Sequence, residues 1–510
     1  MIGMFSRIKS IGILGLDTYM IDVEADLARG LPKFDIVGLP NPSISEAKDR
    51  VHSAIKNNKL VFPVSRITVN LAPADKKKNG TFYDLPILIS ILAASGQLSQ
   101  VSDDTAFIGE LSLDGTIRKV SGVLPMVIEA AANGIKKIFL PKGNAAESVY
   151  VKGIDIFAVE SIAEVIDHLN GFNELVPVKK EDFPEIVEDV YVEDFSEVMG
   201  QYEAKRALEV AAAGGHNIIM VGSPGSGKTM LAKRIPSILP QMTEKESLET
   251  TKIYSIAGEM PDNVSMIKTR PFRSPHHTVS PAGLSGGGSI PKPGELSLAH
   301  NGVLFLDELP EFPRSITETM RQPIEDGVIK IARVQATVSY PSSFMLVCAM
   351  NPCPCGYYGH PTRECTCSKN AVEKYLARVS GPLLDRVDIH IEVPPVDYDD
   401  IKKKADAEKS VDIRKRVNDA REIQNRRFEN SATNCNAKMT PAETRKYCTL
   451  TPDAEKLIKA AFESMSLSAR AYDKILRVSR TIADLENEEN ILPRHVAEAV
   501  RYRSLDRKYW

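Results

Sequence analysis

The stretch Asn217-Ile-Ile-Met-Val-Gly-Ser-Pro-Gly-Ser-Gly-Lys-Thr229 decides the fold of the segment around it. It opens with a short apolar run, which is typical of a strand buried on both faces of a parallel sheet. A glycine-rich turn ending in Lys-Thr follows at once, and Met230-Leu-Ala-Lys-Arg-Ile then begins a helix. A strand, a loop of the form G-x-x-x-x-G-K-[ST] and a helix in this order predict a phosphate-binding loop.

Each part of this loop has a role in holding a nucleotide. The glycines let backbone N–H groups face phosphate oxygens, and the positive end of the helix dipole adds to the attraction. We expect Lys228 to reach the β- and γ-phosphates of ATP and Thr229 to hold Mg²⁺ through its hydroxyl. A glycine-rich turn without function does not explain a lysine at the helix start. The predicted ATP-binding residues are Gly222, Ser223, Pro224, Gly225, Ser226, Gly227, Lys228 and Thr229.

A second apolar run, Val303-Leu-Phe-Leu, ends in Asp307 and Glu308. A carboxylate at the end of a buried strand in the same sheet can meet Mg²⁺ opposite Thr229. We therefore assign Asp307 to Mg²⁺, and Glu308 to the orientation or deprotonation of the attacking water. The alternative is a pair of solvated acids at a strand end, which would leave the phosphate loop without its acidic partner.

A third apolar run, Phe344-Met-Leu-Val-Cys-Ala-Met, ends at Asn351. The amide of Asn351 could contact the γ-phosphate or the attacking water, because parallel strands end at the same edge of a sheet. The alternative is an asparagine that caps the turn before Pro352.

The chain extends well beyond this one α/β unit. Its 510 residues are too many for a single hydrophobic core and suggest about three domains. An ordinary composition excludes disorder over the whole chain. The net charge of −3 argues against general affinity for nucleic acid but leaves room for a local basic channel. We find no apolar run long enough to span a membrane and no signal peptide, so we expect a cytoplasmic protein without a membrane partner.

Changes in pattern divide the chain into four segments. Residues 1–173 alternate strand-like and helix-like stretches, and residues 174–193 are predicted to be a linker, with a covering edge strand as the alternative. Residues 194–398 form the α/β unit, and residues 399–510 a helical domain. The predicted elements are strands 18–24, 67–71, 106–113 and 137–140 with helices 43–56, 85–94 and 123–132 in the first segment, and helices 412–427, 452–465, 472–486 and 494–504 in the last.

Several long motifs surround the nucleotide loop. They are Arg270-Pro-Phe-Arg-Ser-Pro-His-His-Thr, Pro293-Gly-Glu-Leu-Ser-Leu-Ala-His-Asn-Gly-Val-Leu-Phe-Leu-Asp-Glu-Leu-Pro-Glu-Phe, Arg321-Gln-Pro-Ile-Glu-Asp-Gly, Met350-Asn-Pro-Cys-Pro-Cys-Gly and Gly381-Pro-Leu-Leu-Asp-Arg-Val-Asp. With these motifs the chain resembles an AAA+ ATPase of the magnesium-chelatase-like group, and more narrowly the bacterial YifB/ComM family. The resemblance runs essentially from end to end and implies an α/β P-loop core followed by a helical lid.

The family resemblance also implies a ring, taken as a homo-hexamer, with ATP sites between subunits. Such a ring needs an arginine that reaches the neighbour's γ-phosphate, and Arg386 matches that position. The alternatives are a surface salt bridge from Arg386 to Asp385 or Asp388, and Arg378 as the finger. Arg470 matches the lid arginine called sensor 2, or it is an ordinary arginine on a helix surface.

Two segments are candidates for contact with DNA. Residues 269–294, rich in Gly, Pro and Ser, carry Arg270 and Arg273, and the resemblance implies a loop directed toward the ring pore. A predicted β-hairpin before the third strand carries Lys330 and Arg333, which could contact phosphates. The alternative for the hairpin is a solvated charged face.

Four of the seven cysteines lie close together in the sequence. Cys353 and Cys355 form one C-x-C pair, and Cys365 and Cys367 form another on a turn-rich loop. Two thiol pairs of this kind can surround one Zn²⁺ tetrahedrally, so we predict a zinc site, with four reduced thiols as the alternative.

The first segment resembles the proteolytic domain of Lon, which has a ribosomal-protein-S5-like α+β fold. Residues 78–84 lie where that protease carries its serine, and residues 109–115 and 121–126 where its lysine segment begins. A Ser–Lys dyad needs a hydroxyl nucleophile and an amine base. Phe82 and Leu124 occupy those two positions, so we expect a domain without peptidase activity.

Three functions fit these features. The leading hypothesis is an ATP-driven ring motor on DNA, because the resemblance to the ComM branch implies branch migration in recombination during natural transformation. A protein-remodelling ATPase is the first alternative. A magnesium-chelatase-like subunit is the second, and the Lon-like first segment argues against it.

Overall fold

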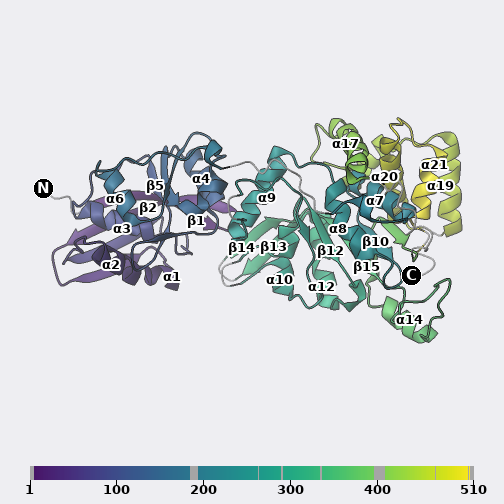
Figure 1. Ribbon diagram of the computed structural model, residues 1–510, viewed down its shortest axis with the longest axis horizontal. Coiled ribbons are helices and arrows are strands. Elements are labelled where there is room, and N and C mark those ends of the chain that lie inside the picture. Colours follow the sequence, from purple (N-terminus) through teal and green to yellow (C-terminus); the bar gives the residue numbers. More distant parts are fainter. Residues whose placement is uncertain are drawn as a thin grey trace.

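The structure is a computed structural model that describes residues 5–183, 193–261, 264–288, 291–333, 336–395, 408–465, 467–503 and 505, without the side chains of residues 333 and 336. Residues 184–192, within the predicted linker 174–193, lie outside this description. The molecule is elongated, with an N-terminal unit at one end, a parallel-sheet unit in the middle and a helical unit at the other end (Figure 1). Within the described ranges, no helix has the length and apolar character needed to cross a bilayer.

A seven-stranded sheet in the order β3-β4-β2-β1-β5-β8-β9 forms the N-terminal unit. Strand β2 alternates buried and partly exposed residues, the pattern of a strand with one face on a core. Helix α3 is apolar and buried over nearly its whole length against β1 and β2. The elements are β1 Phe5–Leu14, β2 Asp17–Ala28, β3 Lys33–Val37, α1 Pro42–Ser45, α2 Ala47–Asn57, β4 Arg66–Ala72, α3 Asp84–Ala94, β5 Thr105–Phe107, β6 Glu110–Leu111, β7 Ile117–Arg118, α4 Val123–Ala132, β8 Lys137–Pro141, α5 Ala145–Ser148, β9 Asp155–Val159 and α6 Ile162–Leu169.

Two predicted elements of this unit are wrong in detail. The helix predicted over residues 43–56 is broken at Glu46, between α1 and α2. The strand predicted over residues 106–113 is divided into β5 and β6, because the N–H of Gly109 leaves the sheet and donates to the carbonyl of Phe82 at 2.9 Å. The other strands and helices predicted in this segment lie within observed elements.

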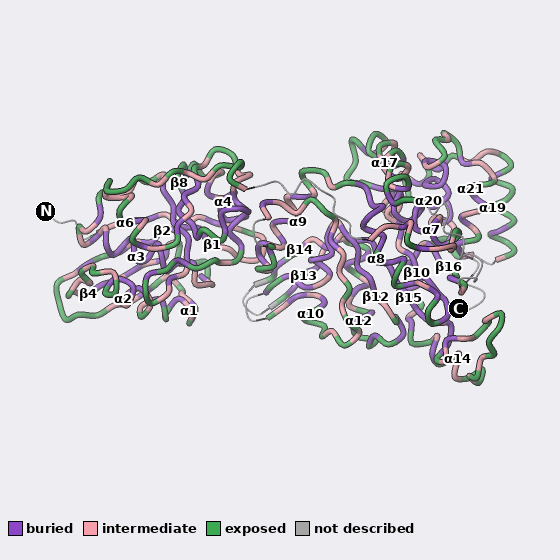
Figure 2. The backbone as a smooth tube through the Cα atoms, viewed as in Figure 1, coloured by how far each residue is buried: buried purple, intermediate pink, exposed green. Residues whose placement is uncertain are grey.

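The middle unit is built on a five-stranded parallel sheet in the order β11-β12-β15-β10-β16. Every residue of β10, β12 and β15 is buried, which explains their uninterrupted apolar sequences (Figure 2). Because the strands are parallel, the residues that follow β10, β12 and β15 meet at one edge of the sheet. The strands are β10 Ile218–Val221, β11 Phe272–Arg273, β12 Val303–Leu306, β15 Met345–Met350 and β16 Ile389–Glu392.

Helices and a hairpin surround this sheet. Helix α8 contacts β12 and β15, and α7 contacts β16. The predicted hairpin is confirmed as the antiparallel pair β13–β14. These elements are α7 Tyr202–Gly214, α8 Lys228–Ile238, α9 Glu244–Ala257, α10 Pro281–Ser285, α11 Glu295–Leu298, α12 Arg314–Thr319, α13 Arg321–Asp326, β13 Val328–Arg333, β14 Ala336–Pro341, α14 Lys369–Leu376 and α15 Gly381–Leu384.

The last unit is helical, as predicted, and packs on α7 and α8. Its helix α20 begins earlier than predicted, α21 ends earlier, and α18 was not predicted. Its core holds buried charges: Asp484 accepts hydrogen bonds from Arg427 at 2.6 and 2.7 Å and from Arg480 at 3.0 Å. The helices are α17 Ser410–Arg427, α18 Pro441–Tyr447, α19 Pro452–Met465, α20 Ala469–Leu485 and α21 Pro493–Arg501.

The N-terminal unit docks on the middle unit through α4, α9 and the hairpin. Helices α4 and α9 are in contact, and the N–H of Gly122 donates to the carbonyl of Ser255 at 2.8 Å (Figure 1). The turn between β1 and β2 approaches β14 so closely that a Cβ on Gly15 would lie 2.1 Å from Val338 Cγ1. The two units are therefore held together by packed surfaces in addition to the chain that joins them.

Candidate functional site

The nucleotide loop lies between β10 and α8, as predicted. Gly225 and Gly227 have φ angles of 77° and 90°, which L side chains rarely adopt, so the loop needs glycine at these positions. A Cβ on Gly222 would lie 2.3 Å from the carbonyl oxygen of Val393, next to the end of β16. The loop is therefore shaped by the backbone and begins α8 at Lys228, where the helix dipole is positive.

Lys228 is largely buried at the centre of the site. Its amine donates hydrogen bonds to the carbonyls of Gly222 at 2.8 Å and Ser223 at 2.9 Å, and to Asn351 Oδ1 at 3.3 Å. Burial lowers the pKa of the Lys228 amine, while the nearby carboxylates of Asp307 and Glu308 act in the opposite direction. Phosphate oxygens are charged acceptors and form stronger bonds to an ammonium group than these neutral oxygens do.

The structure brings Thr229 and Asp307 together although 78 positions separate them in the sequence. The Thr229 hydroxyl donates to Asp307 Oδ2 at 2.7 Å. A hydroxyl and a carboxylate are oxygen ligands of the kind that Mg²⁺ takes beside nucleotide phosphates, so these two residues fit the ion. In the sheet, β15 lies between β12, which Asp307 follows, and β10, which the phosphate loop follows. This strand order allows Asp307 to reach Thr229.

Glu308 directly follows this carboxylate and is exposed to solvent. Its backbone lies in the left-handed region, with φ 52° and ψ 47°, and its N–H donates to Asp307 Oδ1 at 2.9 Å. Glu308 and Asn351 both line a cavity of about 650 Å³. A carboxylate on the wall of an open cavity beside the phosphate loop is placed to accept a proton from water.

Another part of the lining of this cavity was not predicted, except that Arg378 was named as an alternative arginine finger. It is formed by Lys374, Tyr375 and Arg378, on or just after α14. Arg378 forms an ion pair with Glu311 at 3.1 Å, and burial raises the pKa of Tyr375 to about 12. For Lys374 and Tyr375 the sequence signal was the amphipathic pattern of α14, which does not distinguish a cavity wall from an ordinary surface helix.

The predicted arginine finger and the predicted lid arginine have different surroundings. Arg386 follows α15, and its guanidinium forms an ion pair with Glu325 at 2.6 Å and donates to the carbonyls of Arg321 and Pro382. The ion pair foreseen as an alternative is therefore present, with Glu325 in place of Asp385 or Asp388. Arg470 lies exposed in the first turn of α20.

Arg270 and Arg273, the predicted DNA contacts of the insert, both have acidic partners within the chain. Arg270 pairs with Glu246 at 3.1 Å and also donates to backbone carbonyls. Arg273 lies on β11, the edge strand of the core sheet, and pairs with Glu295 at 2.7 Å. Both guanidinium groups thus hold the insert onto the core.

The hairpin offers a different setting for its two basic residues. Lys330 is exposed on β13, beside a cavity of about 440 Å³. The backbone of Arg333 ends β13, and its side chain is outside the description. Lys330 is thus the predicted DNA contact whose described side chain is free to meet a ligand.

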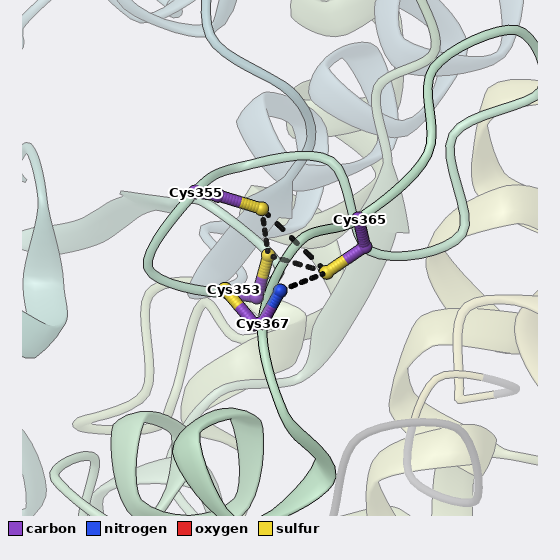
Figure 3. A group of neighbouring side chains, drawn as sticks. All are labelled: Cys353, Cys355, Cys365 and Cys367. Atoms are coloured by element: carbon purple, nitrogen blue, oxygen red, sulfur yellow. Dashed lines mark hydrogen bonds between the residues drawn. The ribbon is translucent and has the colours of Figure 1, made fainter.

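The side chains of the four clustered cysteines converge on one another (Figure 3). Their sulfurs all lie within 4.8 Å of one another. Cys353 Sγ is 3.4 Å from Cys355 Sγ and 3.7 Å from Cys365 Sγ, and Cys355 and Cys365 are 3.5 Å apart. Tetrahedral Zn²⁺ with bonds of about 2.3 Å separates its sulfur ligands by about 3.8 Å, so this cluster fits the ion.

The N-terminal unit has buried apolar side chains where the Lon-like dyad would be. Phe82 is 5% exposed and Leu124 is 1% exposed, and both belong to packed parts of the unit. Lys78 lies nearby in sequence, but its buried amine donates to the carbonyl of Pro73. The absence of peptidase activity stays a prediction for this unit.

Family models match three parts of the chain. The model described as magnesium chelatase, subunit ChlI, matches residues 194–401, which hold the nucleotide site. Subunit ChlI of Mg-chelatase matches residues 23–144, and the ChlI C-terminal model matches residues 407–503.

Individual proteins extend this similarity over the whole chain. The chain is 43% identical to the competence protein ComM of Haemophilus influenzae, over 97% of this chain and 96% of ComM. It is 42% identical to the protein YifB of Escherichia coli, with the same coverage. A shorter match, 31% identical over 26% of this chain and 31% of the relative, is to the DNA repair protein RadA of Listeria monocytogenes. The chain therefore belongs to the magnesium-chelatase-like family of AAA+ proteins that includes ComM and YifB.

Proposed function

We propose that this chain is an Mg²⁺-dependent ATPase that assembles into a homo-hexameric ring and drives DNA branch migration, as a motor in recombination or natural transformation. The observation that carries the ATPase is the hydrogen bond between Thr229 and Asp307, with Glu308 next to it on an open cavity. Thr229 supplies the hydroxyl, Asp307 the carboxylate and Glu308 the general base that phosphoryl transfer to water requires. The family match supports the same activity.

Each residue would act in hydrolysis as follows. Lys228 binds the β- and γ-phosphates and stabilises the charge that develops on them. Glu308 accepts a proton from the attacking water, and the Asn351 amide orients that water or the γ-phosphate. Mg²⁺, held by Thr229 and Asp307, would neutralise phosphate charge when bound.

Ring assembly would complete the site. Arg386 is our candidate for the guanidinium that reaches the γ-phosphate of the neighbouring subunit, and Arg470 for the lid arginine. Arg386 would exchange its ion pair with Glu325 for a phosphate, an acceptor with more charge. Arg378 is the less suitable finger, because it lies on the wall of its own subunit's cavity.

The proposal of DNA as substrate rests on relatives and on one exposed cation. Two relatives carry the names competence protein and DNA repair protein. Lys330 on the hairpin would occur once per subunit, so a ring would multiply its charge around the pore. Such a contact reads phosphates, not bases, and is independent of sequence.

ATP turnover measured with and without four-way or forked DNA tests this function. We expect DNA to stimulate hydrolysis and the purified ring to convert a four-way junction into separated duplexes. An unfolded protein such as casein serves as the comparison ligand. Stimulation by casein in the absence of any DNA effect would replace this proposal with a protein-remodelling ATPase.

We also propose that the four clustered cysteines hold one structural Zn²⁺. All four ligand positions would be taken by sulfur, which is the pattern of a closed structural site. Gly356 within this loop touches the phosphate loop, because a Cβ there would lie 2.4 Å from Pro224 Cδ. The metal would therefore support one wall of the nucleotide site.

A further inference from the structure

The backbone on both sides of Arg386 is held by a lysine from the helical unit. The buried ammonium group of Lys474, on α20, donates hydrogen bonds to the carbonyls of Asp385 and Val387, the latter at 2.9 Å. It also lies 3.4 Å from Asp388 Oδ1, and both side chains are nearly buried, at 12% and 13% exposure. One cation thus binds the residues immediately before and after Arg386.

The intervening carbonyl has a different side-chain donor. Asn217, directly before β10, donates from Nδ2 to the carbonyl of Arg386 at 2.9 Å. Arg503 adds a bond of 2.8 Å to the carbonyl of Val387. Three consecutive carbonyls therefore have side-chain donors, two of them shared with charged groups, which form stronger bonds than neutral donors.

Helix α20 also carries Arg470, the candidate lid arginine, on the same face as Lys474. Arg470 precedes Lys474 by four residues, and residues at i and i+4 lie above one another on a helix. A rotation of α20 that moves the Arg470 guanidinium would also pull on the carbonyls beside Arg386. The helical unit and the loop of Arg386 are thus mechanically joined at this lysine.

We propose that Lys474 is a positioning residue that fixes the loop of Arg386 to α20, so that Arg386 and Arg470 move as one unit when the helical unit moves. This inference rests on the proposed role of Arg386 in hydrolysis. Lys474 does not touch nucleotide, and it acts by setting where the Arg386 backbone lies. A displacement of about 1 Å in such a group is enough to cost about 100-fold in rate.

A double-mutant cycle on the full-length chain tests the coupling. Arg386→Ala should lower kcat by about 1,000-fold if it is the finger. Lys474→Met should lower kcat by about 100-fold while ATP affinity stays within about twofold, because the phosphate loop is untouched. The double variant should be no slower than Arg386→Ala, since a misplaced loop has nothing further to lose. Lys474→Arg, which keeps the charge and the donors, should recover most of the rate.

The control is Lys456→Met, which removes an exposed lysine of the same helical unit, paired with Asp453 on its own helix. It should leave kcat unchanged. If Lys474→Met does not fold, Lys474→Gln, which keeps an N–H donor without the charge, is measured in its place.

The outcomes separate the two proposals. If the loss of kcat in the double variant is the product of the losses in the two single variants, Lys474 has a general structural role and the coupling is overturned. A normal kcat in Lys474→Met with a slow Arg386→Ala would also overturn it, while leaving the finger intact. A normal kcat in Arg386→Ala would remove the proposed finger, and with it the basis of this inference.

Discussion

At the scale of single residues, Glu308 stands out by its backbone. A non-glycine residue in the left-handed region costs about 1–2 kcal/mol, and such conformations persist where the surroundings fix them. Here the N–H of Glu308 is bound to Asp307, and a short 3-10 turn, Leu309–Glu311, follows immediately. The carboxylate is therefore presented to the cavity by a fixed backbone instead of a mobile loop.

Replacing this carboxylate should separate ATP binding from hydrolysis. We expect Glu308→Gln to bind ATP normally and to lose about 100- to 10,000-fold in turnover, the usual contribution of a general base. Lys228→Ala, the companion variant, should lose nucleotide binding itself. Nucleotide affinity and single-turnover hydrolysis measured on both variants provide the test. Full turnover by Glu308→Gln would refute the role assigned to this residue.

The N-terminal unit should have no peptidase activity, again for reasons at single residues. Phe82 has no nucleophile, Leu124 has no base, and both are buried. We expect no cleavage of casein or of fluorogenic peptides by the purified chain. Cleavage that survives purification and disappears when residues beside Phe82 or Leu124 are changed would contradict this prediction.

The residues after the three core strands were predictable because each ends an uninterrupted apolar run. Asp307, Glu308 and Asn351 follow β12 and β15, and parallel topology alone brings such residues together. The surroundings of Arg270 were not predictable, because its partners, Glu246 on α9 and Asn301 just before β12, are brought to it by the tertiary fold. Sequence indicates which side chains can bind phosphate, whereas only tertiary contacts show which of them are already neutralised.

At the scale of elements, the cysteine loop is the clearest case of a segment without a core of its own. Residues 351–368 contain no helix or strand, and of the four cysteines only Cys353 is fully buried. The C-x-C pattern predicted a metal site, and the structure adds that the loop lies against Pro224. That contact could not be foreseen, because it joins segments more than a hundred residues apart.

The metal should therefore affect nucleotide binding as well as stability. We expect about one zinc ion per chain in protein purified under reducing conditions without chelators. Cys355→Ser and Cys367→Ser should lose the ion and bind ATP more weakly, since the loop no longer supports the phosphate loop. Cys435→Ser, a change at a buried cysteine outside the cluster, is the control and should keep the zinc. Metal analysis that finds no zinc in the unmodified chain would remove the site.

Helix and strand boundaries illustrate what local sequence can and cannot determine. Helix α19 was predicted to the residue, because Thr-Pro begins it and a regular apolar stripe follows. Strand β11 was missed, because two residues carry no periodicity and pair only through their position beside β12. The break at Glu46 was missed because the residues on both sides of it are helical.

At the scale of the whole molecule, the contact between the N-terminal unit and the hairpin links two parts with separate predicted roles. Ile13 and Leu14 at the end of β1 pack against the same core as the hairpin residues Ile331 and Val338. The hairpin that carries Lys330 is thus supported by the N-terminal unit. Movement of one should be transmitted to the other.

A side chain at Gly15 should disturb this contact. Gly15→Ala places a methyl group on Val338, so we expect a loss of about 1–3 kcal/mol from overpacking beyond the backbone strain. Gly134→Ala has comparable strain, with φ 83°, but no neighbour within 4 Å, and is the matched control. The midpoint temperature of thermal unfolding should fall further in Gly15→Ala than in Gly134→Ala, and DNA-stimulated turnover should fall in Gly15→Ala alone. Equal behaviour of the two variants would show that the contact is not needed.

The affinity of the chain for DNA should depend on assembly of the ring. The chain has a net charge of −3, so affinity for DNA must come from cations concentrated in one place. Lys330 is exposed on the hairpin, whereas Arg270 and Arg273 are paired with glutamates. A hexamer would present up to about six copies of Lys330, each releasing about 0.9 counterion on binding a phosphate, or about five in total.

Lys330→Gln should therefore weaken DNA binding, lower the slope of log affinity against log salt by up to about five, and leave turnover without DNA unchanged. Lys459→Gln makes the same charge change on α19, which Figure 1 places at the end of the molecule, away from the hairpin in the middle unit. This control should leave both the affinity and the slope as they are. Affinity measured by fluorescence anisotropy at several salt concentrations distinguishes the two variants, because a general charge effect would weaken both equally. If Lys330→Gln binds DNA like the unmodified chain at every salt concentration, the hairpin does not contact phosphates and the DNA path lies elsewhere on the ring.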